Sequence, residues 1–297
     1  MAGYIDPDLL PMVGAIPPTD ISDPVAARER LLALQASRPP FEVPTDLTAQ
    51  WLQVDGVPVL SFRPVDWGSG PALVYLHGGG FVMGSAAGDQ LIASQLAQAT
   101  HGLVLSVDYR LAPEHPFPAA HDDAYAVLRW AAGQPGVERV ALAGSSAGAG
   151  IAAGVALRAR DEGVPVAALL LEIPALDDRA ATASAQWHDA VLWHRGNILD
   201  SWRFYLGGAP ATPYASPPRA ESLAGLPPTY VGVCSTDALR DEGIAFAQRL
   251  SDDGVATELV MYPGLFHGAA STFPTVPACQ RARAALLSAA ERLVARR

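Results

Sequence analysis

The sequence contains no lysine, so all twenty of its basic residues are arginine. A chain without lysine cannot form a Schiff base with a carbonyl substrate or use a serine–lysine dyad. It also has no P-loop lysine for a nucleotide phosphate. The absence of one residue type therefore excludes several classes of enzyme before any motif is considered.

Positive charge is also scarce overall. The formal net charge is -10 at pH 7, and the sequence pI is near 5.1. Such a chain offers no basic surface to neutralise phosphates, so we expect no nucleic-acid partner. A small neutral or cationic substrate is more compatible with this charge.

Cysteine is limited to Cys234 and Cys279, and neither lies in a CxxC motif or beside a pair of histidines. The sequence therefore predicts no zinc or other metal site and no disulfide framework. We expect two reduced thiols that pack in the interior.

A membrane or export signal is not evident either. The N-terminus carries Asp6 and Asp8 where a signal peptide would carry Lys or Arg. Residues 140–157 are uncharged, but most of them are Gly, Ala or Ser, which gain little from lipid. We therefore expect a cytoplasmic protein without a membrane partner.

Apolar runs rich in β-forming residues recur along the chain and alternate with helical patterns. Such alternation predicts an α/β fold with a mostly parallel central sheet flanked by helices. A hairpin around Asp55-Gly56 adds an antiparallel edge, and a terminal helix is expected over residues 277–297. The expected buried strands are residues 72–76, 102–109, 139–144, 167–174, 229–234 and 257–263.

Two regions interrupt this alternation. Residues 1–48 are rich in proline with one helical segment, Pro24–Ala36, and residues 180–210 are aromatic with a helical pattern. We expect both to form a cap over the carboxyl edge of the sheet. The catalytic domain would then consist of residues 49–179 and 211–297. The alternative is that the aromatic side chains only complete a core.

The stretch "GSSAG" at residues 144–148 matches G-x-S-x-G between an expected strand and an expected helix. That context is typical of an elbow that presents a serine nucleophile, here Ser146. A dinucleotide-binding turn is the rival interpretation. Gly148, Gly150 and Ala153 spell G-x-G-x-x-A, and Glu172 lies where a ribose-binding acid belongs. However, the strand is expected to end near residue 143, which puts the first glycine too late for that fingerprint.

A second glycine-rich stretch supports the serine interpretation. The strand at residues 72–76 leads into His77 and then into three consecutive glycines, residues 78–80. Consecutive glycines let backbone N–H groups approach a developing oxyanion.

A serine nucleophile needs a base and an acid that follow it in the order Ser, Asp, His. His267 lies in the loop beyond the last expected strand, whereas His188 and His194 lie in the aromatic region. Two acids stand at strand ends, Asp177 and Asp237. Asp237 is preferred because one helix and one strand separate it from His267. This separation places the two loops that carry them side by side on the sheet.

With these residues in place, the chain resembles the bacterial hormone-sensitive lipase family of α/β-hydrolase esterases. The resemblance implies Ser146 as nucleophile with Asp237 and His267, and it implies no cofactor. The matching stretches are "HGGGF" (77–81), "DYRLAPEHPFPAA" (108–120), "GSSAG" (144–148), "YASP" (214–217), "GLPPTYV" (225–231), "DALRDEG" (237–243) and "YPGLFHG" (262–268).

The resemblance further implies an oxyanion hole made by the N–H groups of Gly79, Gly80 and Ala147, a helical cap and a small-molecule ester as substrate. It leaves the oligomeric state open, with a homodimer as one option. A non-catalytic binding protein on the same fold is the alternative function. The candidate walls of an acyl pocket are Trp187, Trp193, Trp202, Phe204 and Tyr205.

Three residues depart from the family pattern. Ser145 replaces the usual Asp before the nucleophile, Ala238 replaces a usual Pro, and Ala269 stands where an aromatic often follows "HG". None is a member of the expected triad, so substrate range is affected more than the chemistry.

Overall fold

The computed structural model describes residues 3–14, 16 and 19–294. These residues form one eight-stranded sheet in the order β1-β2-β4-β3-β5-β6-β7-β8. The strands are β1 (Leu47–Val54), β2 (Val57–Pro64), β3 (Gly70–Leu76), β4 (Leu103–Val107), β5 (Val137–Ser145), β6 (Leu169–Glu172), β7 (Thr229–Cys234) and β8 (Thr257–Tyr262).

The pairing confirms the predicted α/β class. β1 and β2 form an antiparallel hairpin around Asp55 and Gly56, and β2 also pairs antiparallel with β4. All pairs from β4 through β3, β5, β6 and β7 to β8 are parallel. The carboxyl ends of these parallel strands therefore meet at one edge, where loops can gather functional side chains.

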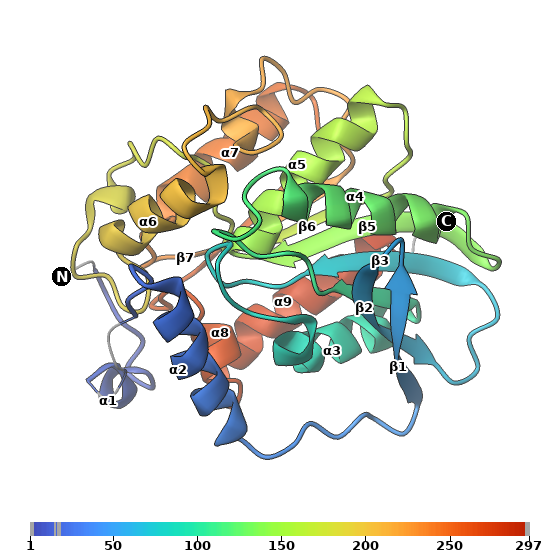
Figure 1. The fold of residues 1–297 in the computed structure, drawn as a ribbon. Helices are drawn as coiled ribbons and strands as arrows, with labels where there is room; N and C mark the ends of the chain where they lie inside the picture. Colours follow the sequence, from blue (N-terminus) through green and yellow to red (C-terminus); the bar gives the residue numbers. More distant parts are fainter. Residues whose placement is uncertain (1–2, 15, 17–18, 295–297) are drawn as a thin grey trace.

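Helices cover both faces of the sheet, with α3 and α9 on one face and α4, α5 and α7 on the other (Figure 1). On β5, Val140 and Leu142 join one core cluster while Ala141 and Ala143 join the other, because successive strand residues point to opposite faces. The main helices are α1 (Leu10–Val13), α2 (Pro24–Ala36), α3 (Gln90–Thr100), α4 (Ala119–Ala132), α5 (Ala147–Asp161), α6 (Arg195–Leu206), α7 (Arg240–Asp252), α8 (Ala269–Thr272) and α9 (Pro277–Val294).

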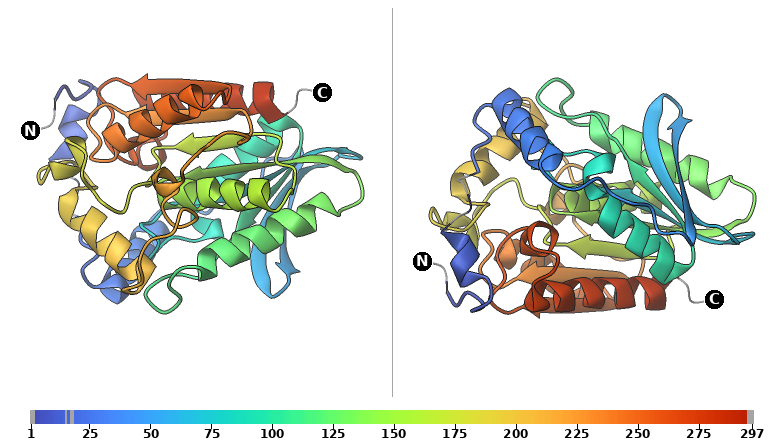
Figure 2. Two further views of the ribbon diagram at one scale, coloured as in Figure 1. Left: turned by 90° about the horizontal axis from the view of Figure 1, so that it is seen from above. Right: turned by 90° about the horizontal axis from the view of Figure 1, so that it is seen from below.

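The segments α1, α2 and α6 lie at the end of the sheet toward which the parallel strands point (Figure 2). The prediction of a helix over Pro24–Ala36 is confirmed, and Asp23 caps it by accepting the N–H groups of Val25 and Ala26. Residues 180–210 are less helical than expected. They contain α6 and one short 3₁₀ turn, Ser184–Gln186.

The last two long helices of the chain are α7 and α9. The helix α7 ends at Asp252 with Asp253 as its C-cap, and Gly254 follows one residue later at φ +79°. Glycine is favoured there because the left-handed conformation carries no Cβ penalty. The predicted closing helix is confirmed as α9 over Pro277–Val294, and the rest of its predicted span lies outside the described residues.

Cys234 and Cys279 are free thiols, and both are buried, as the sequence predicts. Within the part of the chain that the structure describes, no helix has both the length and the apolar character to cross a bilayer.

Candidate active site

The nucleophile elbow forms where β5 turns directly into α5. Ser146 sits between them at φ +54° and ψ -118°, a strained conformation for a residue with a Cβ. A Cβ added at Gly144 would lie 2.4 Å from the backbone of Gly148, and one added at Gly148 would lie 2.1 Å from the carbonyl oxygen of Leu76. The N–H of Ser146 donates to the carbonyl of Glu172 at 2.8 Å. Both glycines are therefore required by close backbone packing, as the motif predicts.

The side chains of Ser146, His267 and Asp237 form a hydrogen-bonded row. The Oγ of Ser146 lies 2.9 Å from Nε2 of His267, and Nδ1 of His267 lies 2.7 Å from Oδ2 of Asp237. The second oxygen of Asp237 accepts the N–H of Leu239 at 2.8 Å. All three triad side chains are buried. A neutral imidazole held in this way carries its proton on Nδ1 and can take the serine proton on Nε2.

Sheet topology explains how residues so far apart in sequence meet. Ser146, Asp237 and His267 follow β5, β7 and β8, whose carboxyl ends lie at the same edge of the sheet. The two loops that carry Asp237 and His267 leave adjacent strands, as the sequence predicts.

The glycine loop after β3 lies against the nucleophile. A Cβ added at Gly78 would lie 3.4 Å from Cβ of Ser146. Gly79 and Gly80 have φ values of +128° and +59°, which favour glycine. Ala147 is the first residue of α5, so its N–H belongs to the positive end of a helix. The glycine loop and the first turn of α5 thus lie beside Ser146, and the oxyanion hole expected from Gly79, Gly80 and Ala147 stays a prediction.

The residue before the three glycines, His77, has a buried side chain that packs against Tyr109. The ring of His77 stacks on Tyr109 with centroids 4.1 Å apart, and the hydroxyl of Tyr109 donates to the carbonyl of His77 at 2.7 Å. Burial lowers the pKa of His77. The lowered pKa favours an uncharged His77 ring beside the glycine loop. Tyr109, which supports this ring, was not predicted as a site residue from the sequence.

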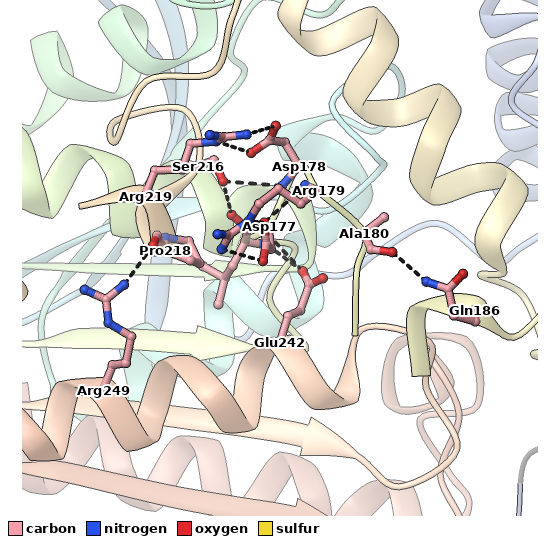
Figure 3. Close-up of polar contacts among 11 residues, drawn as sticks. Asp177, Asp178, Arg179, Ala180, Gln186, Ser216, Pro218, Arg219, Glu242 and Arg249 are labelled. Atoms are coloured by element: carbon pink, nitrogen blue, oxygen red, sulfur yellow. Dashed lines mark hydrogen bonds and ion pairs between the residues drawn. The ribbon is translucent and has the colours of Figure 1, made fainter. Parts of the chain in front are cut away.

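The rival acid Asp177 has a different partner. Its carboxylate is held by the guanidinium of Arg179 at 2.7 and 2.8 Å (Figure 3). Asp237 rather than Asp177 bonds to His267. The neighbouring Asp178 pairs in the same way with Arg219. The pair of Asp177 and Arg179 lies within the loop after β6, whereas the pair of Asp178 and Arg219 ties this loop to the segment that follows α6.

Glu242 in the first turn of α7 completes this network (Figure 3). Its Oε1 accepts the N–H of Leu176 at 2.6 Å, and Oε2 is buried with no hydrogen-bond partner among the residues that the structure describes. Burial raises the pKa of Glu242 well above its usual range. The Glu242 carboxyl anchors the loop after β6 by accepting the N–H groups of Leu176 and Asp177.

The five aromatic side chains proposed as pocket walls are in different surroundings. Trp193 lies beside the site, with its ring centroid 5.6 Å from that of His267. Trp202 and Tyr205 pack on Phe81, at the end of the glycine loop, with centroids 5.1 and 4.0 Å away. Only Trp193 among the five has a described contact with a triad residue.

The remaining two aromatic residues, Trp187 and Phe204, lie under arginine guanidinium groups, Arg240 at 4.8 Å and Arg203 at 4.0 Å. Both rings are only partly buried, and neither has a described contact with a triad residue. The structure therefore gives no reason to regard these two side chains as pocket walls.

The other two histidines considered as bases have local surroundings of their own. His194 caps α6 by accepting the N–H of Gly196 at 3.1 Å, and His188 is exposed. His267 is the histidine that bonds to the serine.

The dinucleotide interpretation is not supported. Gly148, Gly150 and Ala153 all lie inside α5 and are buried. A Cβ on Gly150 would lie 2.0 Å from the carbonyl of Ala175, so this glycine serves close helix packing rather than a phosphate. Among the described residues, no group of three or more His, Cys, Asp or Glu could hold a metal ion.

Glu172, the acid proposed for a ribose, has an unexpected environment. It pairs with Ser145 across β5 and β6 and is buried. Burial raises the pKa of Glu172 to about 7, and the charge of Arg283 opposes that rise. An ionisable group thus lies directly beside the elbow.

Comparison with known proteins agrees with this geometry. The sequence profile of the α/β hydrolase fold matches residues 73–271. Esterase LipI of Mycobacterium tuberculosis (strain ATCC 25618 / H37Rv) is 40% identical over 94% of this chain and 92% of its own length. Carboxylesterase NlhH of the same strain is 35% identical over 97% and 96%. A solved structure named bacterial heroin esterase superposes with a TM-score of 0.93, at 39% identity and over 98% of each chain.

Proposed function

The chain belongs to the α/β-hydrolase fold family and is a carboxylic ester hydrolase, and we propose that it cleaves short- to medium-chain esters through an acyl-enzyme on Ser146. This membership confirms the resemblance to hormone-sensitive lipase-type esterases. The observation that carries the proposal is the row from Ser146 Oγ through His267 to Asp237, at 2.9 and 2.7 Å.

The first half of the reaction acylates the serine. His267 Nε2 takes the hydroxyl proton while Oγ of Ser146 attacks the ester carbonyl carbon. The imidazolium then donates this proton to the alcohol oxygen, and the carbon–oxygen bond to the alcohol breaks. Asp237 holds the imidazole in the required tautomer and stabilises its charge.

The second half restores the enzyme. A water molecule gives a proton to His267 as its oxygen attacks the acyl carbon, and the proton returns to Oγ of Ser146 as the acid leaves. In both halves the negative oxygen lies against the N–H groups of Gly79, Gly80 and Ala147. Each such donor contributes roughly 2.7–4 kcal/mol of transition-state stabilisation.

Burial of the site supports a limit on acyl length. Ser146 and His267 are only 6% and 7% exposed, so little open space surrounds the reacting atoms. Each added methylene gains at most about 0.8 kcal/mol while room remains and then clashes with the walls. The burial of the two reacting side chains therefore favours acyl groups of modest length.

The test is kcat/KM measured on p-nitrophenyl esters from acetate to palmitate. We expect a rise to about butyrate or hexanoate and a fall beyond about octanoate, without activation above the solubility limit of the substrate. A steady rise through palmitate, or a jump in rate at an oil–water interface, would instead indicate a lipase.

A further inference from the structure

The side chain of Trp193 touches the site at two places. It lies in the loop between the 3₁₀ turn Ser184–Gln186 and α6, and it is 5% exposed. Its ring is tilted by 32° over the ring of His267. A Cβ added at Gly80 would lie 2.4 Å from Cη2 of Trp193. One indole ring therefore contacts both the catalytic histidine and the oxyanion loop.

These two contacts define which part of an ester lies next to the indole. In the tetrahedral intermediate, the carbon attached to Ser146 carries the oxyanion, the alcohol oxygen and the acyl chain. The oxyanion lies against the loop of Gly79 and Gly80, and the alcohol oxygen must lie within hydrogen-bond reach of His267 Nε2 to receive its proton. A group between Gly80 and His267 therefore borders the alcohol rather than the acyl chain.

The backbone holds the indole in this place. Leu192 precedes it at φ +64°, a conformation that side-chain-bearing residues adopt only where their surroundings impose it. Leu192 and Val191 pack against the core cluster that contains Leu9 and Phe266. The N–H of Trp193 also bonds to the carbonyl of Val191 at 2.8 Å. The segment that carries the Trp193 indole is thus supported by the N-terminal segment and by the loop that carries His267.

We propose that Trp193 determines which alcohol groups the enzyme accepts, because its indole ring limits the space beside the leaving oxygen. Small alcohols fit without displacing the ring, and bulky branched alcohols collide with it. This inference rests on the proposed function, since it assumes that His267 protonates the leaving alcohol.

The experiment compares two series of esters in wild type, Trp193→Ala and Trp193→Phe. The alcohol series is ethyl, cyclohexyl and menthyl acetate, and the acyl series is ethyl acetate, butyrate and hexanoate. Each kcat/KM is divided by the wild-type value for the same ester, which cancels the intrinsic reactivity of the substrate. Trp51→Ala is the control, because Trp51 is 53% exposed on the edge strand β1, which carries no residue of the site.

We expect Trp193→Ala to raise the relative kcat/KM for menthyl over ethyl acetate by about tenfold or more, within the range that pocket contacts give. Trp193→Phe should give a smaller gain in the same direction, and it carries the test alone if melting curves show that the alanine variant does not fold. The acyl series should keep its wild-type order in both variants, and Trp51→Ala should match wild type throughout.

Two results overturn the inference. One is unchanged alcohol selectivity in a folded, active variant, and the other is a shift confined to the acyl series, which would place Trp193 on the acyl side. Failure of the proposed function would differ from both, because wild type itself would then hydrolyse none of these esters.

Discussion

The Nε of Arg28 donates a hydrogen bond of 2.6 Å to the carbonyl oxygen of Val82, which joins α2 to the end of the oxyanion loop. The same guanidinium donates to the carbonyl of Ala112 at 2.8 Å and pairs with Glu114 at 2.7 Å. This pairing lowers the pKa of Glu114 to about 2. One side chain of the N-terminal segment therefore fixes two loops around the site.

Arg28→Ala should lower kcat by roughly 10- to 100-fold with a smaller change in KM, because a misplacement of about 1 Å in a catalytic group can cost that much. Steady-state kinetics on p-nitrophenyl butyrate measure the effect. Arg30→Ala is the control, since Arg30 lies on the same helix but donates to the carbonyl of Asp20 instead. Equal kcat values in the two variants would mean that α2 does not position the loop.

Local patterns predict much of this fold and site. The elbow at Ser146 and the glycine loop are recognisable because each requires particular small residues within a few positions. Asp237 and His267 follow from chain order, because the strands before them are apolar runs that end at the same edge.

Contacts across the fold could not be predicted in this way. The bond from Arg28 to Val82 spans 54 residues, and no motif marks either end. The orientation of Trp193 depends on the positive φ of Leu192, which its sequence does not suggest. Glu172 is the last residue of β6, which lies between β5 and β7 in the sheet. Its burial depends on these neighbouring strands, which are distant in the sequence.

Asp237→Asn should lower kcat by about 10⁴-fold, because the amide favours the wrong imidazole tautomer of His267. Asp177→Asn should change kcat little, since the carboxylate of Asp177 pairs with Arg179 and not with His267. Both exchanges keep the size of the side chain, so the pair separates catalysis from folding. The opposite ranking of the two variants would transfer the role of acid to the loop after β6.

Glu172 should make the stability of the protein depend on pH. Its pKa is raised from 4.5 to about 7 in the folded protein. Between these values the folded state keeps a proton that the unfolded chain has lost, so the free energy of unfolding decreases as pH rises. The shift corresponds to about 3 kcal/mol, which is fully lost above pH 7.

Glu172→Gln, which cannot ionise, should therefore match wild type near pH 4.5 and exceed its free energy of unfolding by about 2–3 kcal/mol at pH 8. Urea denaturation at the two pH values measures the difference. Glu291→Gln, at an exposed position on α9, should follow the wild-type curve. A wild-type protein that gains stability relative to Glu172→Gln as pH rises would contradict the buried, proton-bearing state of Glu172.

The most direct test of the account is to map the residue that reacts with diethyl p-nitrophenyl phosphate, which leaves a stable phosphoryl group on a serine nucleophile. Trypsin cleaves after Arg139 and Arg158, so it releases residues 140–158 as one peptide. This peptide contains both Ser145 and Ser146, and the masses of its fragments must show which of them is labelled. We predict one phosphoryl group on Ser146 with proportional loss of esterase activity, and an unlabelled Ser146→Ala variant that is at least about 10³-fold less active. Labelling of Ser145 or of any other residue, or near wild-type turnover by Ser146→Ala, would contradict the account.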